Sequence, residues 1–204
     1  MKNIYPFKSK VGYEQRRYQM QQEPRLVWLT GLSGSGKSTL ALRLEHHLFH
    51  QGYKVFLLDG DNIRNGLCRD LSFTQQDRKE NMRRVAEVAN LMLEAGMVVI
   101  CAFISPYEEE RELARHIVGP ERFTEVYINC SLRVCEQRDT KGLYAKARQG
   151  LIKEFTGISA PYEVPQNPHL ILNTDQEKID DSLQKLVTLV EPQLRLQQRM
   201  KAAM

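Results

Sequence analysis

The sequence contains one complete motif whose residues bind phosphate. Residues 31–38 read Gly-Leu-Ser-Gly-Ser-Gly-Lys-Ser, the G-x-x-x-x-G-K-S/T pattern of a phosphate-binding loop (P-loop). The glycines let the backbone wrap around a phosphate, Lys37 can reach the β- and γ-phosphates, and the Ser38 hydroxyl can ligate Mg²⁺. The motif therefore predicts a nucleoside triphosphate site at Gly31, Leu32, Ser33, Gly34, Ser35, Gly36, Lys37, Ser38 and Thr39.

Two carboxylates follow a second apolar run. Residues 55–62 read Val-Phe-Leu-Leu-Asp-Gly-Asp-Asn, which places Asp59 and Asp61 at the end of a predicted strand, where open α/β sheets bind ligands. Because one residue separates them, their side chains are expected to point in different directions. One could serve a metal, and the other could act as general base on an acceptor hydroxyl. Alternatively, Asp61 or Asn62 caps the following helix.

Basic residues recur at helical spacing further along the chain. Arg78, Asn81 and Arg84 are three residues apart in a predicted helix and therefore share a face. Two guanidinium groups and an amide suit an anion with phosphate- or sulfate-like oxygens. The alternative is a solvated face on which the arginines pair with Asp77 and Glu80.

A third polar position follows another apolar run, where residues 103–107 read Phe-Ile-Ser-Pro-Tyr. This turn is expected at the same sheet edge as Asp61, which suits contact with a substrate. The Ser105 hydroxyl could be phosphorylated, but no residue adjacent in sequence could act as its base. A serine that shapes a turn or caps a helix is the simpler interpretation.

These residues are positioned by an alternation of strands and helices. Short apolar runs typical of strands buried on both faces lie at 26–30, 55–59, 98–103, 124–129 and 170–172, and helical patterns lie at 37–50, 75–94, 108–116, 132–138 and 178–190. The alternation predicts an α/β fold of the P-loop NTPase type, with a parallel sheet of about five strands flanked by helices.

Three segments lack this alternation. Residues 139–168 are rich in lysine and glycine and end in a proline-rich run, which predicts a mobile lid, with a short helix within 144–153; a solvated basic loop is the alternative. Residues 1–24 are polar and without periodicity, and are expected to be an arm or a disordered tail. We expect one domain over 25–192 and a C-terminal tail over 193–204.

The composition is that of an ordinary soluble protein. The chain has 204 residues, of which 42% are hydrophobic and 26% charged, and its net charge of +4 is too small to suggest nucleic-acid binding. No apolar stretch is long enough to span a membrane, and the first residues lack the apolar core of a signal peptide. The four cysteines lack zinc-site or redox-site spacing, so reduced thiols and a cytoplasmic location are expected.

Six stretches in order resemble the adenylylsulfate kinase family, whose members phosphorylate the 3′-hydroxyl of adenosine 5′-phosphosulfate (APS). They cover roughly residues 25–174 and read GLSGSGKST, LDGDNIR, LSFTQQDRKENMRR, FISPY, CEQRDTKGLYAKAR and IKEFTGISAPYE. The resemblance implies that residues 25–192 form an ATP-dependent kinase domain, that its substrates are ATP and APS, and that its product is 3′-phosphoadenosine 5′-phosphosulfate (PAPS), an intermediate of sulfate assimilation.

The resemblance also implies roles for individual residues. The adenine of APS would lie between Phe73 and Phe155, a use of aromatic faces that stacking allows. The phosphosulfate would contact Arg64, Arg78 and Asn81, assisted by backbone groups around Ile104 and Ser105 and by Lys153. Asp61 would lie near the 3′-hydroxyl as base or orienting group, and Asp59 on the magnesium side. Lys37 and Lys141 would approach the transferred phosphoryl group. Ser105 aligns with a serine described as a phosphoenzyme residue, although direct in-line transfer is physically sufficient.

Two other functions are weighed against this one, along with the expected partners. A kinase for a nucleoside, nucleotide or sugar would share the P-loop, but FISPY and the FTGI within the lid argue against it. A nucleotide-binding switch of the GTPase class would carry an N-K-x-D motif, which is absent. Mg²⁺ is expected as cofactor and a homodimer as the assembly, with no nucleic-acid or membrane partner.

Overall fold

Five parallel strands form one sheet in the computed structural model, which describes residues 5, 7 and 9–196. The strand order is β2-β3-β1-β4-β5, so the strand that precedes the P-loop is central. The strands are β1 (Leu26–Thr30), β2 (Val55–Asp59), β3 (Val98–Ala102), β4 (Phe123–Asn129) and β5 (Leu170–Asn173). The predicted fold class is confirmed, and each predicted strand agrees with the structure within one residue at either end.

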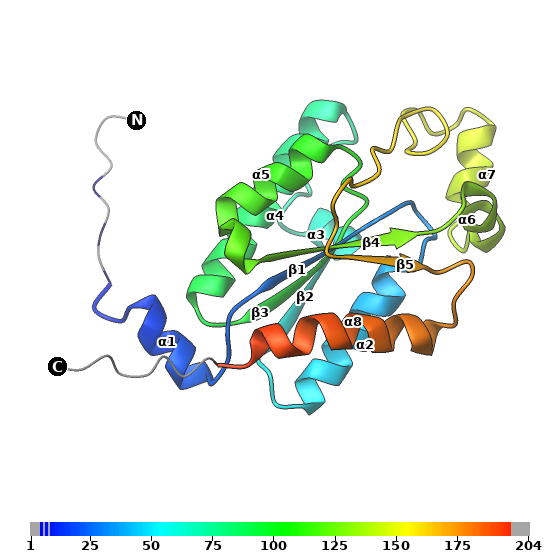
Figure 1. Cartoon of the computed structure of the whole chain (residues 1–204). Helices are drawn as coiled ribbons and strands as arrows, with labels where there is room; N and C mark the ends of the chain where they lie inside the picture. Colours follow the sequence, from blue (N-terminus) through cyan, green and yellow to red (C-terminus); the bar gives the residue numbers. More distant parts are fainter. Residues whose placement is uncertain (1–4, 6, 8, 197–204) are drawn as a thin grey trace.

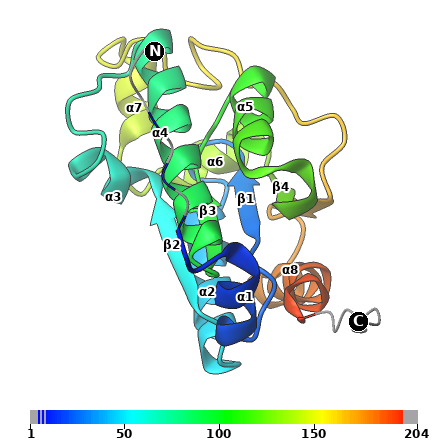
Figure 2. The ribbon, with the colours of Figure 1, turned by 90° about the vertical axis from the view of Figure 1, so that its left-hand side faces the viewer.

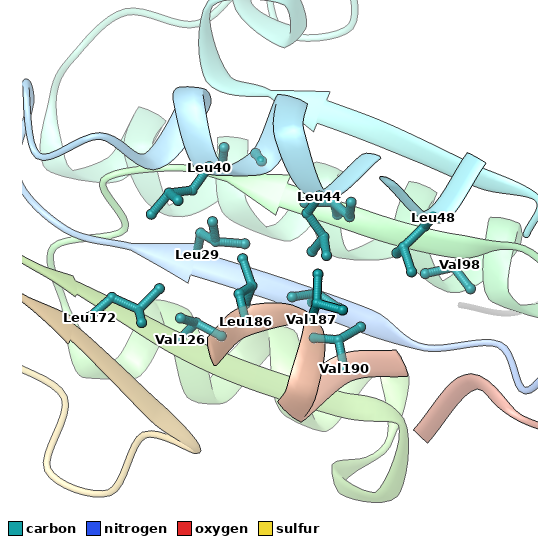
Figure 3. Packing of buried hydrophobic residues seen from close by; sticks show 14 of the residues in the cluster. Leu29, Leu40, Leu44, Leu48, Val98, Val126, Leu172, Leu186, Val187 and Val190 are labelled. Carbon is teal, nitrogen blue, oxygen red and sulfur yellow. The ribbon is translucent and has the colours of Figure 1, made fainter. Parts of the chain in front are cut away.

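Helices cover both faces of the sheet (Figure 1). On one face, α2 (Lys37–His50) and α8 (Ile179–Leu194) pack against inward-facing leucines and valines of the strands, around Leu29, Leu44 and Leu186 (Figure 3). On the other face, α4 (Gln75–Glu94) and α5 (Glu108–Val118) pack around Trp28, which is fully buried. The strands therefore read as continuous apolar runs because both of their faces are buried.

The shorter helices lie where the sheet meets the site. They are α3 (Gly60–Asn65), α6 (Leu132–Arg138) and α7 (Leu143–Arg148), and a 3₁₀ turn spans Pro120–Arg122. A small apolar cluster that includes Cys130, Tyr144 and Phe155 holds α6, α7 and the lid segment together. The short helix predicted within 144–153 is thus present but begins one residue earlier and ends at Arg148.

All five strands end at one edge of the sheet, and three of them, β1, β2 and β3, lead into residues that the sequence analysis selected. The P-loop follows β1, Asp59 ends β2, Ser105 comes shortly after β3, and Thr174 follows β5. The parallel register places these chain segments side by side. This edge, where α6 and α7 also lie, is where the site is built (Figure 1).

The N-terminal segment differs from the prediction of an arm or disordered tail. Helix α1 (Tyr13–Met20) lies at the opposite end of the sheet from α6 and α7, and Figure 2 looks at the molecule from that end. The sequence of this helix shows little apolar periodicity, so the helix was not predicted. Polar contacts hold it instead: Arg17 is buried and pairs with Glu23. The first four residues, also assigned to the arm, lie outside the described part of the chain.

Two further boundaries are corrected. Helix α8 continues to Leu194, beyond the predicted residue 190, because Leu194 is fully buried against the core. The predicted tail therefore begins inside a helix, and its residues 197–204 lie outside the described residues. In the described ranges 5, 7 and 9–196, no helix is long and apolar enough to cross a membrane.

Gln22 provides a test of the N-terminal packing. Its buried side chain donates to the backbone oxygens of Lys54 (3.1 Å) and Gly96 (2.8 Å) and accepts from the Lys54 N–H (2.8 Å). Replacement by alanine leaves the Gly96 oxygen and the Lys54 N–H without these bonds, whereas the Lys54 oxygen keeps its bond from the Val98 N–H. Gln22→Ala should therefore lower the free energy of unfolding by about 1–3 kcal/mol, measured by urea denaturation. The matched control Gln19→Ala, at an exposed position of α1, should change it little; equal effects of the two would contradict this role.

Candidate active site

One large cleft, of about 1130 Å³, opens along the carboxyl edge of the sheet. It brings together most of the residues predicted from the sequence. Those that line it are Ser33, Gly34, Gly36, Lys37, Ser38, Thr39, Asp59, Asp61, Arg64, Phe73, Arg78, Ile104, Ser105, Lys141, Lys153 and Phe155. Gly31, Leu32, Ser35 and Asn81, also predicted, do not line it.

The P-loop connects β1 to α2 through a turn that requires glycine. At Gly31 a side chain would place its Cβ 2.5 Å from the backbone oxygen of Ile128 on the neighbouring strand, and the residue has a φ of +154°. Gly36, with a φ of +102°, caps the start of α2. Side chains are strained or excluded at both positions, so the loop can bring its backbone N–H groups and the helix N-terminus close to a phosphate.

Lys37 is buried inside this loop. Its ammonium donates a hydrogen bond to the backbone oxygen of Leu32 at 2.7 Å. Burial lowers the pKa of Lys37 to about 8, and the nearby acidic group of Asp59 opposes that shift only in part. The lysine is therefore still mostly protonated at neutral pH and is held ready for an anion.

Asp59 and Ser38, the two residues predicted to hold a metal, are in contact. The Ser38 hydroxyl donates to Oδ2 of Asp59 at 2.7 Å, and Oδ1 of Asp59 accepts from the Asp61 backbone N–H at 3.1 Å. Mg²⁺ prefers such oxygen ligands and takes few from the protein when a triphosphate supplies others. Among the described residues, no group of three His, Cys, Asp or Glu side chains is placed to hold a metal ion.

The start of α3 tests the alternative interpretation of these residues as a helix cap. Asp59 caps the start of α3, whereas the alternative interpretation gave this role to Asp61 or Asn62. Asp61 instead forms an ion pair with Lys141, which follows α6 across the cleft. The two carboxylates thus take different partners, as their spacing predicts.

Arg64, Phe73 and Arg78 form a second group on the wall of the cleft. The Arg64 guanidinium lies 4.3 Å from the centre of the Phe73 ring and donates to the Ser72 backbone oxygen at 3.0 Å. Arg78 is 5.9 Å from the same ring. This wall therefore combines two positive charges with an exposed aromatic face.

Arg78 also joins α4 to the lid. It donates to the backbone oxygens of Phe73 (2.9 Å) and Glu154 (2.8 Å) and to the Thr156 hydroxyl (3.2 Å). Arg84 behaves differently, because it pairs with Asp70 (2.7 Å) and Glu80 (2.9 Å) outside the cleft. The interpretation as a salt-bridged surface therefore holds for Arg84, and Arg78 enters the cleft.

Asn81 is fully buried and faces neither the cleft nor a partner. Within the described residues, neither its amide nitrogen nor its amide oxygen makes a hydrogen bond. Arg78, one turn earlier on α4, does line the cleft. The prediction that Asn81 contacts an anion is therefore not matched by its position in this structure.

The lid supplies an apolar wall. Phe155 is buried and packs edge-on against Tyr144 of α7, with ring centres 5.0 Å apart. Phe73 is 61% exposed, and Lys153 is also exposed. Both phenylalanine rings line the same cleft, so a planar apolar group can contact either of them.

Ser105 has a structural partner. Its side chain is almost fully buried, and its oxygen accepts from the Trp28 indole N–H at 3.0 Å. The residue adopts a φ of +37°, and its backbone oxygen accepts from Arg111 at 2.8 Å. The interpretation of Ser105 as a turn residue agrees with these contacts.

Several cleft residues were missed by the sequence analysis. Arg138, at the end of α6, donates to the Thr174 backbone oxygen at 2.6 Å and lies 3.4 Å from the backbone oxygen of Gly34 in the P-loop. Arg138 and Tyr144 lie within the CEQRDTKGLYAKAR stretch, which could have indicated them. Glu110 also lines the cleft, but the run Glu-Glu-Glu-Arg looks like an ordinary exposed helix start.

Comparison with known proteins gives consistent results. The Adenylylsulphate kinase family matches residues 23–173. An adenylyl-sulfate kinase of Geotalea daltonii is 53% identical over 168 residues, 82% of this chain and 83% of the relative. One from Staphylococcus epidermidis is 49% identical over 179 residues, 88% of this chain and 90% of the relative.

A solved structure is similar over nearly its whole length. It is a Mycobacterium tuberculosis APS kinase in complex with AMPPNP and APS, with 47% sequence identity and a TM-score of 0.80. The similarity covers 83% of this chain and 98% of that chain. The family match over residues 23–173 contains all five strands and the P-loop.

The buried lysine predicts a pH dependence of nucleotide binding. Bound triphosphate needs the charged form of Lys37, whose pKa of about 8 in the free protein lies below the ordinary 10.5. Above pH 8 the lysine must regain a proton to bind, so the affinity for ATP should fall by up to about tenfold per pH unit. Calorimetry between pH 7 and about pH 9.5 measures this. Lys37→Arg keeps its charge and should lose the inflection; a flat wild-type profile would contradict the prediction.

Proposed function

Because this chain belongs to the adenylylsulphate kinase family, we propose that it transfers the γ-phosphate of ATP to the 3′-hydroxyl of APS. The products are ADP and PAPS. The observation that carries this proposal is that a single cleft contains both the P-loop and the wall formed by Arg64, Phe73 and Arg78. Donor and acceptor can therefore meet without leaving the protein.

The donor end binds ATP through the P-loop. Backbone N–H groups and the N-terminus of α2 face the phosphates, and Lys37 exchanges its hydrogen bond with Leu32 for one to the β- or γ-phosphate. Ser38 and Asp59 would hold Mg²⁺ directly or through water, and the ion would neutralise charge on the phosphate oxygens. Their existing hydrogen bond already brings the two oxygens together.

The acceptor end binds APS through aromatic and basic side chains. Its adenine lies between Phe73 and Phe155, and its phosphosulfate contacts Arg64 and Arg78, with Lys153 and the backbone around Ile104 and Ser105 assisting. What supports this assignment is that all of these residues line the cleft. Asn81 joins them only if its buried amide, which has no partner among the described residues, is reached by the ligand.

The transfer is an in-line displacement. A bond forms between the 3′-oxygen of APS and the γ-phosphorus, and the bond to the bridging oxygen of ADP breaks. Asp61 orients the hydroxyl and receives its proton late, because the transition state is loose. Lys141, which pairs with Asp61 across the cleft, moves to the transferred phosphoryl group when ATP is present.

The lid, residues 139–168, excludes water during the transfer. A hydroxyl acceptor must compete with water for the γ-phosphate, so closure favours the correct reaction. The bonds from Arg78 to Glu154 and Thr156 connect the acceptor wall to this segment. Acceptor binding at Arg78 is thereby linked to the position of the lid.

The remaining expectations concern the setting of the enzyme. A cytoplasmic location and a homodimeric assembly stay predictions. Size-exclusion chromatography tests the assembly. The four cysteines are free and buried, which accords with a reducing compartment. No observation favours a different acceptor or a nucleotide-binding switch over APS.

The experiment that tests the function is ADP release from Mg·ATP by the purified protein. Acceptors are APS, with AMP, adenosine and gluconate as controls. We expect strong stimulation by APS alone and a 3′-phosphorylated product by mass spectrometry. Stimulation by gluconate or adenosine instead would contradict the acceptor assignment while leaving the P-loop chemistry intact.

Asp61 separates chemistry from binding. Asp61→Asn removes the proton acceptor and the partner of Lys141 while keeping the size of the side chain, so kcat should fall by about a hundredfold or more with little change in the KM for ATP. Steady-state kinetics measure both constants. The control Asp70→Asn changes an exposed carboxylate outside the cleft and should have little effect on either. A large rise in the KM for ATP with normal kcat would instead assign Asp61 to the metal.

Ser105 separates direct transfer from a phosphoserine route. Ser105→Ala should keep kcat within about threefold, because the proposed transfer does not pass through the hydroxyl. It should lower the free energy of unfolding by about 1–3 kcal/mol, because the Trp28 indole N–H loses its acceptor. Loss of turnover in a variant that remains folded and binds ATP would instead support a phosphoserine intermediate.

A further inference from the structure

One buried carboxyl in the cleft has no role in the proposed transfer. Glu110 lies in the first turn of α5, is 1% exposed, and lines the cleft together with Arg78, Ser105 and Pro106. Neither of its carboxyl oxygens bonds to another side chain within the described residues; the polar group beside it is the Tyr107 backbone at the start of α5. A buried carboxyl without a cation or side-chain donor beside it is costly to keep charged, and a contact with the start of its own helix offsets only part of that cost. Its position on the wall of a binding cleft therefore suggests a function.

The charged groups around Glu110 already have other partners. Glu109 pairs with Lys79 of α4 at 3.0 Å, and Arg111 pairs with Glu125 of β4 at 2.9 Å. In the lid, the Glu163 carboxylate accepts from the Glu108 backbone N–H at 2.7 Å. Arg78 donates its hydrogen bonds to backbone and hydroxyl oxygens as described above. Among these described neighbours, Glu110 is thus the acid that has no side-chain partner.

The environment leaves Glu110 near the balance between its two forms. Burial raises the pKa of Glu110 to about 7, while the Tyr107 backbone, Arg78 and Arg111 favour the charged form and Glu109 disfavours it. A negative ligand placed beside it therefore meets a group that is partly neutral and partly negative. The electrostatic repulsion between the carboxylate and the ligand increases with the negative charge of the ligand.

The proposed acceptor has a close competitor with a different charge. APS and ADP share adenosine and an α-phosphate, and they end in tetrahedral groups of similar size. The sulfate of APS carries one negative charge, whereas the terminal phosphate of ADP carries close to two at neutral pH. ADP is also a product of the reaction, so it is always present where APS must bind.

From these observations we propose that Glu110 is a specificity-determining residue, whose carboxyl admits the singly charged sulfate of APS and disfavours the doubly charged terminal phosphate of ADP. The inference rests on the proposed function. Arg64 and Arg78 attract either anion, and they cannot distinguish one charge from two except by attracting ADP more strongly. An acidic group on the same wall reverses that preference, which is discrimination by repulsion.

The substitution Glu110→Gln tests this directly. It keeps the shape of the side chain, removes the acidic group and adds an amide that can donate hydrogen bonds to an anionic oxygen. We expect the kcat/KM for ADP as acceptor to rise, and its ratio to the kcat/KM for APS to rise about tenfold or more. Transfer of labelled phosphate from ATP to the 3′-hydroxyl of each acceptor measures both constants. A saturating concentration of ATP suppresses competition by ADP at the P-loop in wild type and variant alike.

A matched control uses the neighbouring residue. Glu109→Gln makes the same chemical change at an exposed position and should leave the ratio unchanged. If Glu110 had only a structural role, its replacement would lower the kcat/KM for both acceptors together and could not increase phosphorylation of ADP. An unchanged ratio, or an equal loss for both acceptors, would therefore overturn the inference.

A second measurement uses the wild-type protein and therefore does not depend on the folding of a variant. In the wild-type protein, the thiophosphate analogue of ADP keeps its terminal charge nearly constant between about pH 6.5 and pH 8, as the sulfate of APS does. Its kcat/KM relative to that of APS should fall several-fold as Glu110 ionises over this range. A flat ratio would contradict the inference. Absence of APS phosphorylation in the wild type would instead contradict the proposed function.

Discussion

Every part of the cleft depends on five parallel strands that end at one edge of one sheet. Their continuous apolar sequences bury both faces, so the polar residues that follow them can only gather at that edge. The P-loop, Asp59, Ser105 and Thr174 come from four different strands, yet each is delivered to the same side. The close approach of Gly31 to the Ile128 backbone shows how tightly this edge is packed.

Within the cleft, most charged and polar groups are occupied by one another. Lys37 bonds to its own loop, Asp61 pairs with Lys141, and Arg78 bonds to the lid. Substrate binding is therefore an exchange of partners, in which little desolvation of bare charges is required. Two buried side chains differ: Glu110 on the cleft wall and Asn81, which does not line the cleft, have no side-chain partner among the described residues.

The sequence predicted what is local and missed what depends on tertiary contacts. The P-loop and the strand limits follow from short-range spacing, and they agree with the structure. Spacing could not separate Arg78 from Arg84, because their difference arises from the lid on one side and Asp70 on the other. Helix α1 was missed because polar contacts, and not an apolar stripe, hold it. Glu110 was missed because an acidic helix start is ordinary until its burial is known.

The bonds from Gln22 to Lys54 and Gly96 have a consequence for where the folding unit begins. These bonds join the segment before β1 to the residues that lead into β2 and β3, at the end of the sheet remote from the cleft. A boundary drawn at the first strand would remove them. A fusion partner or a truncation should therefore join the chain before Tyr13, and an added domain at that end would sit far from the entrance used by both nucleotides.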